Sequence, residues 1–329
     1  MKGTTTTDIA RSRGAPRIKF TYQAALGLLL VALIVLFGIL QPVFFHLNVL
    51  FDTTSIVGEI GIMALAMTFI ITTGGIDLSV GYILQLSAIV FGVVLKGSGS
   101  LASAVACSLA AGTACGFING IIISKTRIPP LVTTLATMNL FRGVSFIIAG
   151  TSSYTGFPAG FKLISTYLVF NAIPVQFFYF LFLFVFFNLV YARGKLGRSL
   201  KGIGFNEGVL LFSGIRTKRI LLFIYTLCGL MCAVAALIYL GRLSAAKTSM
   251  GNDLNLQVIT AVVLGGTSIM GGVGSMVGTF IGVLRKGFTL VNFSGNIFNF
   301  TLGLVLIVAL IVFAMIEERK KTSGRKLNS

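Results

Sequence analysis

The chain has 329 residues, of which 56% are hydrophobic and 10% are charged, and its mean hydropathy is +0.98. Soluble globular domains carry about 25% charged residues, so this composition excludes an ordinary soluble protein. The formal net charge of +18 could indicate nucleic-acid binding. However, Lys and Arg gather in the tails and in two short loops between apolar runs, as the positive-inside rule predicts for membrane proteins. We therefore expect no nucleic-acid partner.

Ten apolar runs approach the roughly 20 residues that a membrane-spanning helix needs. The ninth run is the weakest, because it contains Arg285 and Lys286. The sequence therefore predicts an all-α polytopic membrane protein, with about ten transmembrane helices in a single domain over residues 21–316. The predicted spans are residues 21–40, 54–73, 79–95, 101–124, 130–150, 167–191, 219–240, 256–271, 275–292 and 297–316.

The basic residues predict how this domain is oriented. They gather in the N-terminal tail (1–20), at Lys125 and Arg127, in the loop 193–218 and in the C-terminal tail (317–329). An even number of predicted spans separates each of these four segments from the next, so all four lie on the same side of the membrane. The positive-inside rule makes that side cytoplasmic. We therefore expect two cytoplasmic tails, a cytoplasmic loop at 193–218 and an outer loop at 241–256.

Residues 73–81 place glycines and polar residues between the second and third spans. Gly74 and Gly75 can end one helix, and Asp77 can cap a helix that begins near Leu78. A carboxylate that faced lipid at a helix centre would cost roughly 2.5–3.5 kcal/mol, so a helix end, protein or water must satisfy Asp77. A broken helix beside a transport path is also compatible with this pattern. The candidate path residues here are Gly74, Gly75, Asp77 and Ser79.

The fourth and fifth spans carry two further patterns. Gly112, Gly116 and Gly120 are four residues apart and predict a face for close helix packing, which we expect to be buried within one subunit rather than between subunits. Asn139 and Arg142 share one helix face. They could line a polar path or anchor a neighbouring helix, or Arg142 could reach the outer surface.

The loop 193–218 contains a short predicted helix. Asn206 suits a helix N-cap, Gly214 suits the residue just after a helix, and the residues between them include four apolar side chains. A short helix flanked by cations can lie in the membrane surface or seat in a groove of a cytoplasmic partner.

Glycines recur near the end of the chain, over residues 261–279. Gly265 and Gly266 begin a run of glycines that permits close approach or a positive φ. The pair Gly271 and Gly272 repeats the spacing of residues 74–81, which indicates either an internal repeat around a path or a coincidence in a glycine-rich chain.

No catalytic constellation appears in the sequence. It has one histidine and no phosphate-binding Gly-x-x-x-x-Gly-Lys-[Ser/Thr] loop, so we expect no enzyme activity, no cofactor and no metal. The four cysteines all fall in apolar runs and are expected to be buried, inert thiols. An ion-coupled transporter would need intramembrane acids, for which Asp77 and Glu59 are the candidates; we expect Glu59 to bond a neighbouring helix.

Four stretches resemble the permeases of sugar-type ABC importers, the group that includes the ribose, xylose, galactose and autoinducer-2 permeases. They are residues 74–81, 128–143, 197–215 and 261–279. This resemblance implies an ATP-driven importer for a monosaccharide or a related small polar solute, in the bacterial cytoplasmic membrane. Its partners would be a cytoplasmic ABC ATPase, an extracytoplasmic solute-binding protein and a second permease subunit, identical or related.

The resemblance also implies that the loop 193–218 docks onto the ATPase. Three departures from the family pattern are visible. The small residues usual in the docking helix are replaced at 208–211, and Asn255 and Gln257 stand where acidic residues are usual. The chain after residue 279 is also shorter than the family pattern, so Arg285 and Lys286 come early and the ninth span is expected to be short or partly re-entrant. The candidate coupling residues are Gly197, Arg198, Gly204, Asn206, Glu207, Phe212, Ser213 and Gly214.

Overall fold

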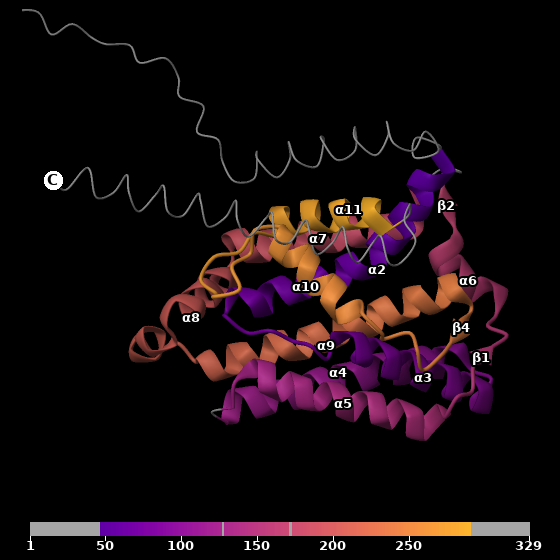
Figure 1. Ribbon diagram of the computed structural model, residues 1–329, viewed down its shortest axis with the longest axis horizontal. Helices are drawn as coiled ribbons and strands as arrows, with labels where there is room; N and C mark the ends of the chain where they lie inside the picture. The colour runs from indigo at the N-terminus through magenta and orange to yellow at the C-terminus, as the bar shows by residue number, and fades with distance from the viewer. Residues whose placement is uncertain (1–46, 127, 171–172, 291–329) are drawn as a thin grey trace, which may run out of the picture.

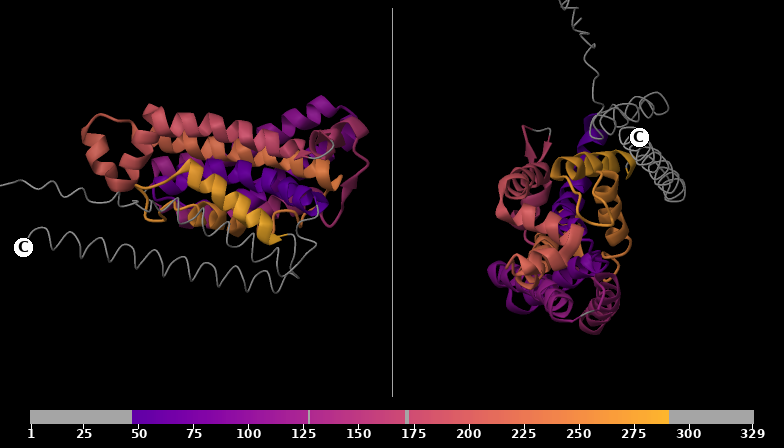
Figure 2. Two further views of the ribbon diagram at one scale, coloured as in Figure 1. Left: turned by 90° about the horizontal axis from the view of Figure 1, so that it is seen from above. Right: turned by 90° about the vertical axis from the view of Figure 1, so that its left-hand side faces the viewer.

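The computed structural model describes residues 47–126, 128–170 and 173–290 as a helical bundle. Its long helices run side by side along one axis (Figures 1 and 2). Both tails and the predicted spans 21–40 and 297–316 lie outside the described residues. The helices are α2 (Leu47–Thr72), α3 (Val80–Ser98), α4 (Leu101–Lys125), α5 (Pro130–Ala149), α6 (Ala159–Thr166), α7 (Val175–Arg193), α8 (Lys195–Phe212), α9 (Thr217–Leu243), α10 (Leu254–Leu264) and α11 (Met276–Leu290).

Four two-residue strands complete the described structure. Strand β1 (Tyr154–Thr155) pairs antiparallel with β4 (Ala245–Ala246), and β2 (Leu168–Val169) pairs antiparallel with β3 (Ile173–Pro174). These strands and α6 lie at one end of the bundle, whereas α8 lies at the other end (Figure 1).

The centre of the bundle consists of α2, α3 and α9. Residues 57–72 of α2 and residues 80–89 of α3 are all buried. Helices that are apolar on all sides are buried either in protein or in a membrane, and here the surrounding helices cover α2 and α3. Five of the described helices are long and apolar enough to cross a membrane, namely α3, α4, α5, α7 and α9.

The glycine face of α4 packs against α9, as the sequence predicts. A Cβ atom on Gly112 would lie 2.6 Å from the Cβ of Ala233, and a Cβ on Gly116 would lie 2.8 Å from the Cα of Gly229. These approaches leave no room for a side chain, so the small residues set the distance between the two helices.

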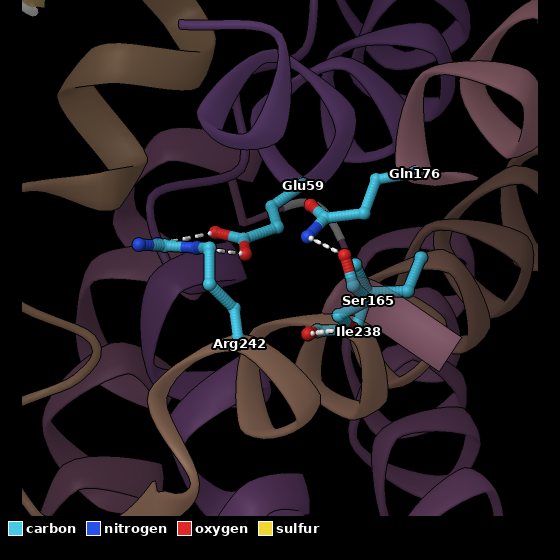
Figure 3. Close-up of polar contacts among 5 residues, drawn as sticks. All are labelled: Glu59, Ser165, Gln176, Ile238 and Arg242. Carbon is cyan, nitrogen blue, oxygen red and sulfur yellow. Dashed lines mark hydrogen bonds and ion pairs between the residues drawn. The ribbon is translucent and has the colours of Figure 1, made fainter. Parts of the chain in front are cut away.

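A buried ion pair joins α2 to α9 near the end of the bundle that carries α6. Glu59 accepts two hydrogen bonds from Arg242, at 2.8 Å from Nε and 3.0 Å from Nη2 (Figure 3). Beside it, Gln176 donates to the carbonyl of Ser165, whose hydroxyl donates to the carbonyl of Ile238. The expectation that Glu59 bonds a neighbouring helix is confirmed.

Three predicted segments are wrong in detail. The span 167–191 begins only at Val175, because Pro174 belongs to a strand pair and cannot supply a helical N–H. The span 256–271 is an 11-residue helix, α10, of about 16 Å, which ends at Gly265. The predicted outer loop 241–256 begins inside α9, and its later part packs against α3.

Two smaller predictions also need correction. Helix α3 begins at Val80 with Ser79 as its N-cap, two residues later than expected. Of the four cysteines, Cys107 is exposed on α4 and the other three are buried.

Candidate functional site

The junction between α2 and α3 is closed by its glycines. Gly74 has a φ of +81°, the N–H of Gly75 donates to the carbonyl of Ile70, and the N–H of Gly74 donates to that of Ile71. This hydrogen-bond pattern is the usual glycine-ended helix stop, as the sequence predicts. The chain then continues without regular structure to residue 79.

Asp77 is fully buried in this junction. Its Oδ1 accepts hydrogen bonds from the backbone N–H of Ser79 at 2.8 Å and from the Ser79 hydroxyl at 2.6 Å. The side-chain amide of Asn119, on α4, donates to the same hydroxyl at 2.8 Å. Among the described residues, no hydrogen-bond partner is found for Asp77 Oδ2, Asn119 Oδ1 or Tyr225 Oη. A polar cluster with spare capacity for hydrogen bonding is therefore enclosed between α3, α4 and α9.

Helix α5 holds the backbone on both sides of Asp77. The hydroxyl of Thr134 donates to the carbonyl of Ile76 at 3.0 Å and accepts from the N–H of Leu78 at 3.2 Å. A buried threonine thus replaces the hydrogen bonds that the broken helix cannot make for itself. Neither Thr134 nor Asn119 was a candidate from the sequence. The one feature that could have indicated them is a hydroxyl or amide side chain within an apolar span.

The two glycine motifs contact each other at the end of the bundle that carries α8. The N–H of Gly272 donates to the carbonyl of Thr72 at 2.9 Å. A Cβ on Gly271 would lie 2.7 Å from the backbone nitrogen of Gly74. The shared spacing therefore marks two turns that pack on one another.

Gly204 of α8 joins this contact. A Cβ on Gly204 would overlap the carbonyl oxygen of Thr72 and the backbone nitrogen of Gly272. Gly265, at the end of α10, is buried against α11: a Cβ on Gly265 would lie 2.5 Å from the carbonyl carbon of Gly278. We call Gly74, Gly204, Gly271 and Gly272 the glycine junction.

Helix α8 is bent at Asn206, whose φ of −165° and ψ of 102° are not helical. The Asn206 side chain accepts from the N–H of Val209 at 3.3 Å, and Gly214 has a φ of +76°. The predicted N-cap and helix end are both confirmed. The sequence missed the first part of α8, which runs without a break from Lys195 to the bend.

The other candidate coupling residues divide into buried and exposed. Gly197 is buried against the backbone of Tyr191. The exposed residues of this set are Arg198, Asn206, Glu207, Phe212, Ser213 and Gly214.

Asn139 and Arg142 lie apart from the Asp77 cluster, on an exposed face of α5. The Asn139 amide donates to the carbonyl of Leu135 in its own helix. The guanidinium of Arg142 lies 5.7 Å from the centre of the Tyr82 ring. The described helices of this chain therefore do not bury Arg142, and its roles in a path, as an anchor or at the outer surface stay predictions.

The family of the chain follows from comparison with known proteins. Residues 49–316 match the family described as the permease component of a branched-chain amino acid transport system. The chain belongs to this permease family. The predicted ABC importer permease is therefore confirmed, as is its location in the bacterial membrane. A permease of this kind does not catalyse a reaction itself and works with an ATPase and a binding protein.

Permeases of the same family that resemble this one carry the name autoinducer 2 import system permease protein LsrD. That of Photorhabdus temperata is 35% identical over 93% of this chain and 95% of its own length. That of Klebsiella pneumoniae is 34% identical over 90% and 92%, and that of Escherichia coli K12 is 38% identical over 83% and 84%. No solved structure matches this permease.

Proposed function

We propose that this permease carries a monosaccharide or a related small polar solute into the cell, driven by a separate ATPase. Autoinducer 2 is the first candidate solute, because the similar permeases are named for its import. Ion coupling by intramembrane acids is less favoured, because Glu59, one of the two candidate acids, is bound by Arg242.

The proposed topology has ten crossings, with both termini and α8 in the cytoplasm. The α8 end of the bundle carries a dense set of cations, which supports a cytoplasmic position. They include Arg193, Lys195, Arg198, Arg216, Lys218 and Arg219. In this topology α10 makes its crossing together with the segment before it, which packs along α3, because α10 alone is too short to cross about 30 Å of hydrocarbon.

We further propose that α8 docks into the ATPase. The observation that carries this proposal is the apolar surface of its second half: Phe212 is 96% exposed and Val209 is 58% exposed, and Phe205 before the bend is 74% exposed. Aromatic side chains that protrude this far on a cationic background suit a groove in a protein partner better than water. Gly204 of α8 packs on Thr72 at the end of α2 and on Gly272 in the turn before α11. A displacement of α8 would therefore move α2 and the start of α11.

The solute path is proposed to lie between this chain and a second permease subunit, identical or related. The exposed faces of α4 and α5 would face that subunit and the path. Asn139 and Arg142 are proposed to line the path, since both are exposed. Gly74, Gly75, Asp77, Ser79, Gly265 and Gly266 are proposed to shape the path from within the chain, since four of them, Gly75, Asp77, Ser79 and Gly265, are buried. Of these, the exposed Arg142 argues most directly for a polar surrounding, since lipid around a guanidinium is costly.

The experiment is uptake by proteoliposomes that contain this permease, its ATPase and its binding protein, with labelled autoinducer 2. We expect uptake to require ATP and both partners. Phe212→Asp should reduce both ATPase co-purification and uptake at least tenfold, which corresponds to about 1.4 kcal/mol or more of binding energy. Phe182→Asp, at a side chain of α7 that is 71% exposed, is the matched control for docking and should retain the ATPase. Uptake that is driven by an ion gradient without ATP would overturn the proposal.

A further inference from the structure

The exposed side of Arg142 faces a polar surface that the sequence placed outside the membrane. Arg142 follows Pro130 by twelve residues in α5, which is roughly 18 Å of helix. Its guanidinium lies by Tyr82, the third residue of α3, whose other end at Ser98 is roughly 24 Å away. Arg142 therefore lies beside the first turn of α3 and not beside its last turn at the α6 end of the bundle.

The segment between β4 and α10 folds down along α3 to the same level. A Cβ on Gly81 would lie 2.5 Å from the carbonyl oxygen of Gly251, and the N–H of Gly251 donates to the buried Gln85 side chain at 3.2 Å. Close backbone packing and a buried hydrogen bond thus fix this segment on α3. Asp253, with a φ of +60°, then turns the chain into α10.

This packing places two asparagines beside Tyr82 and α5. The Tyr82 hydroxyl donates to Asn252 Oδ1 at 3.4 Å, and the side-chain amide of Asn255 approaches the Met138 sulfur of α5 at 3.8 Å. Asn252 is exposed and Asn255 is half-buried. We call Tyr82, Arg142, Asn252 and Asn255 the Arg142 surface.

The chemistry of the Arg142 surface suits a compact solute with neighbouring hydroxyl groups. The guanidinium offers a fork of N–H donors that can bind two adjacent oxygens, and the amides of Asn252 and Asn255 can both donate and accept. Within the described residues no carboxylate lies within 4 Å of Arg142. Its donors are therefore not committed to an ion pair, unlike those of Arg242.

We propose that the Arg142 surface contacts the transported solute inside the membrane and selects for vicinal hydroxyl groups. This inference rests on the proposed import function and deepens it. Tyr82 and Arg142 supply an aromatic face with a cation over it, and Asn252 and Asn255 supply directional hydrogen bonds. The solute would meet these groups after it leaves the binding protein and before it passes the glycine junction.

The test uses the complete reconstituted importer, with autoinducer 2 and D-ribose as the two probes. Arg142→Met and Asn252→Ala should each reduce uptake of the better substrate at least tenfold, and Arg142→Lys should change the ratio of the two uptake rates. Lys96→Met is the matched control, since Lys96 also lies over a tyrosine ring, that of Tyr154, but at the far end of α3.

A labelling experiment on the same complexes gives a second readout. With Cys107 replaced by serine, Asn252→Cys should react with a water-soluble maleimide, and excess autoinducer 2 should slow that reaction. Phe182→Cys on α7 should react poorly, because we expect it to face lipid. Uptake within twofold of the parent in both Arg142→Met and Asn252→Ala would overturn the inference, as would an unreactive Asn252→Cys. A parent importer that shows no ATP-dependent uptake would instead refute the proposed function itself.

Discussion

Glu59 and Arg242 form a bidentate ion pair that is buried unequally on its two sides. The Glu59 side chain is 4% exposed, whereas the Arg242 side chain is 27% exposed. The pair links the centre of α2 to the last turn of α9, 183 positions away in the sequence. Removal of Arg242 would therefore leave a buried carboxylate without a partner, whereas removal of Glu59 would leave a guanidinium that is partly exposed.

We expect Arg242→Leu to destabilise the permease more than Glu59→Leu. Loss of one member of a buried pair costs about 3–5 kcal/mol, because the remaining charge is left without compensation. Arg242 can turn toward solvent after Glu59 is lost, but Glu59 cannot. Thermal unfolding of the detergent-purified protein measures both values. The double leucine variant should recover part of the loss, and equal effects of the two single variants would contradict this account.

The contact between α4 and α9 should not tolerate a methyl group. Gly116→Ala and Gly229→Ala would each force a Cβ into the backbone of the facing helix, and overpacking of this kind costs about 1–3 kcal/mol. We expect a lower yield of folded protein and a lower unfolding temperature. Gly143→Ala is the control, because nothing lies within 4 Å of its Cβ position, and it should be neutral or slightly stabilising.

Gly204→Ala should separate ATP hydrolysis from transport. A methyl group there would push α8 away from Thr72 and Gly272, while the exposed apolar side chains of α8 would remain able to dock. We expect ATPase binding to persist and the stimulation of hydrolysis by loaded binding protein to fall several-fold. Gly208→Ala, in the same helix, would place a Cβ near only the Asn206 side-chain oxygen, at 3.2 Å. It should retain coupling, and equal losses in both variants would argue against a role for the glycine junction.

The Asp77 cluster gives a graded prediction. Asp77→Ala would leave the N–H and the hydroxyl of Ser79 without their acceptor in a buried place, at a cost of about 1–3 kcal/mol. Asp77→Asn keeps an oxygen acceptor of similar shape and should lose less. Unfolding temperatures of the two variants test the order. A reversed order would show that the Ser79 hydrogen bonds do not hold this junction.

Some local features could be predicted from residue type alone. The glycine stop at Gly74, the cap at Asn206 and the end of α8 at Gly214 follow from backbone preferences that act within a few residues. The failures lie elsewhere: apolarity could not separate a full span from the short α10, nor a helix from the β2–β3 pair. In a uniformly apolar stretch, periodicity carries too little information to place such a boundary.

The sequence by itself determined that this protein is a helical membrane protein, because hydropathy and cation placement are properties of single segments, and its resemblance to ABC permeases indicated its function. Only the tertiary structure decided which segments meet. It brought Gly204 onto Thr72 and Gly272, placed Thr134 across the backbone beside Asp77, and carried Asn252 to Tyr82. These contacts depend on how the helices rotate and approach one another, and small residues permit several such arrangements until packing of the whole bundle selects one.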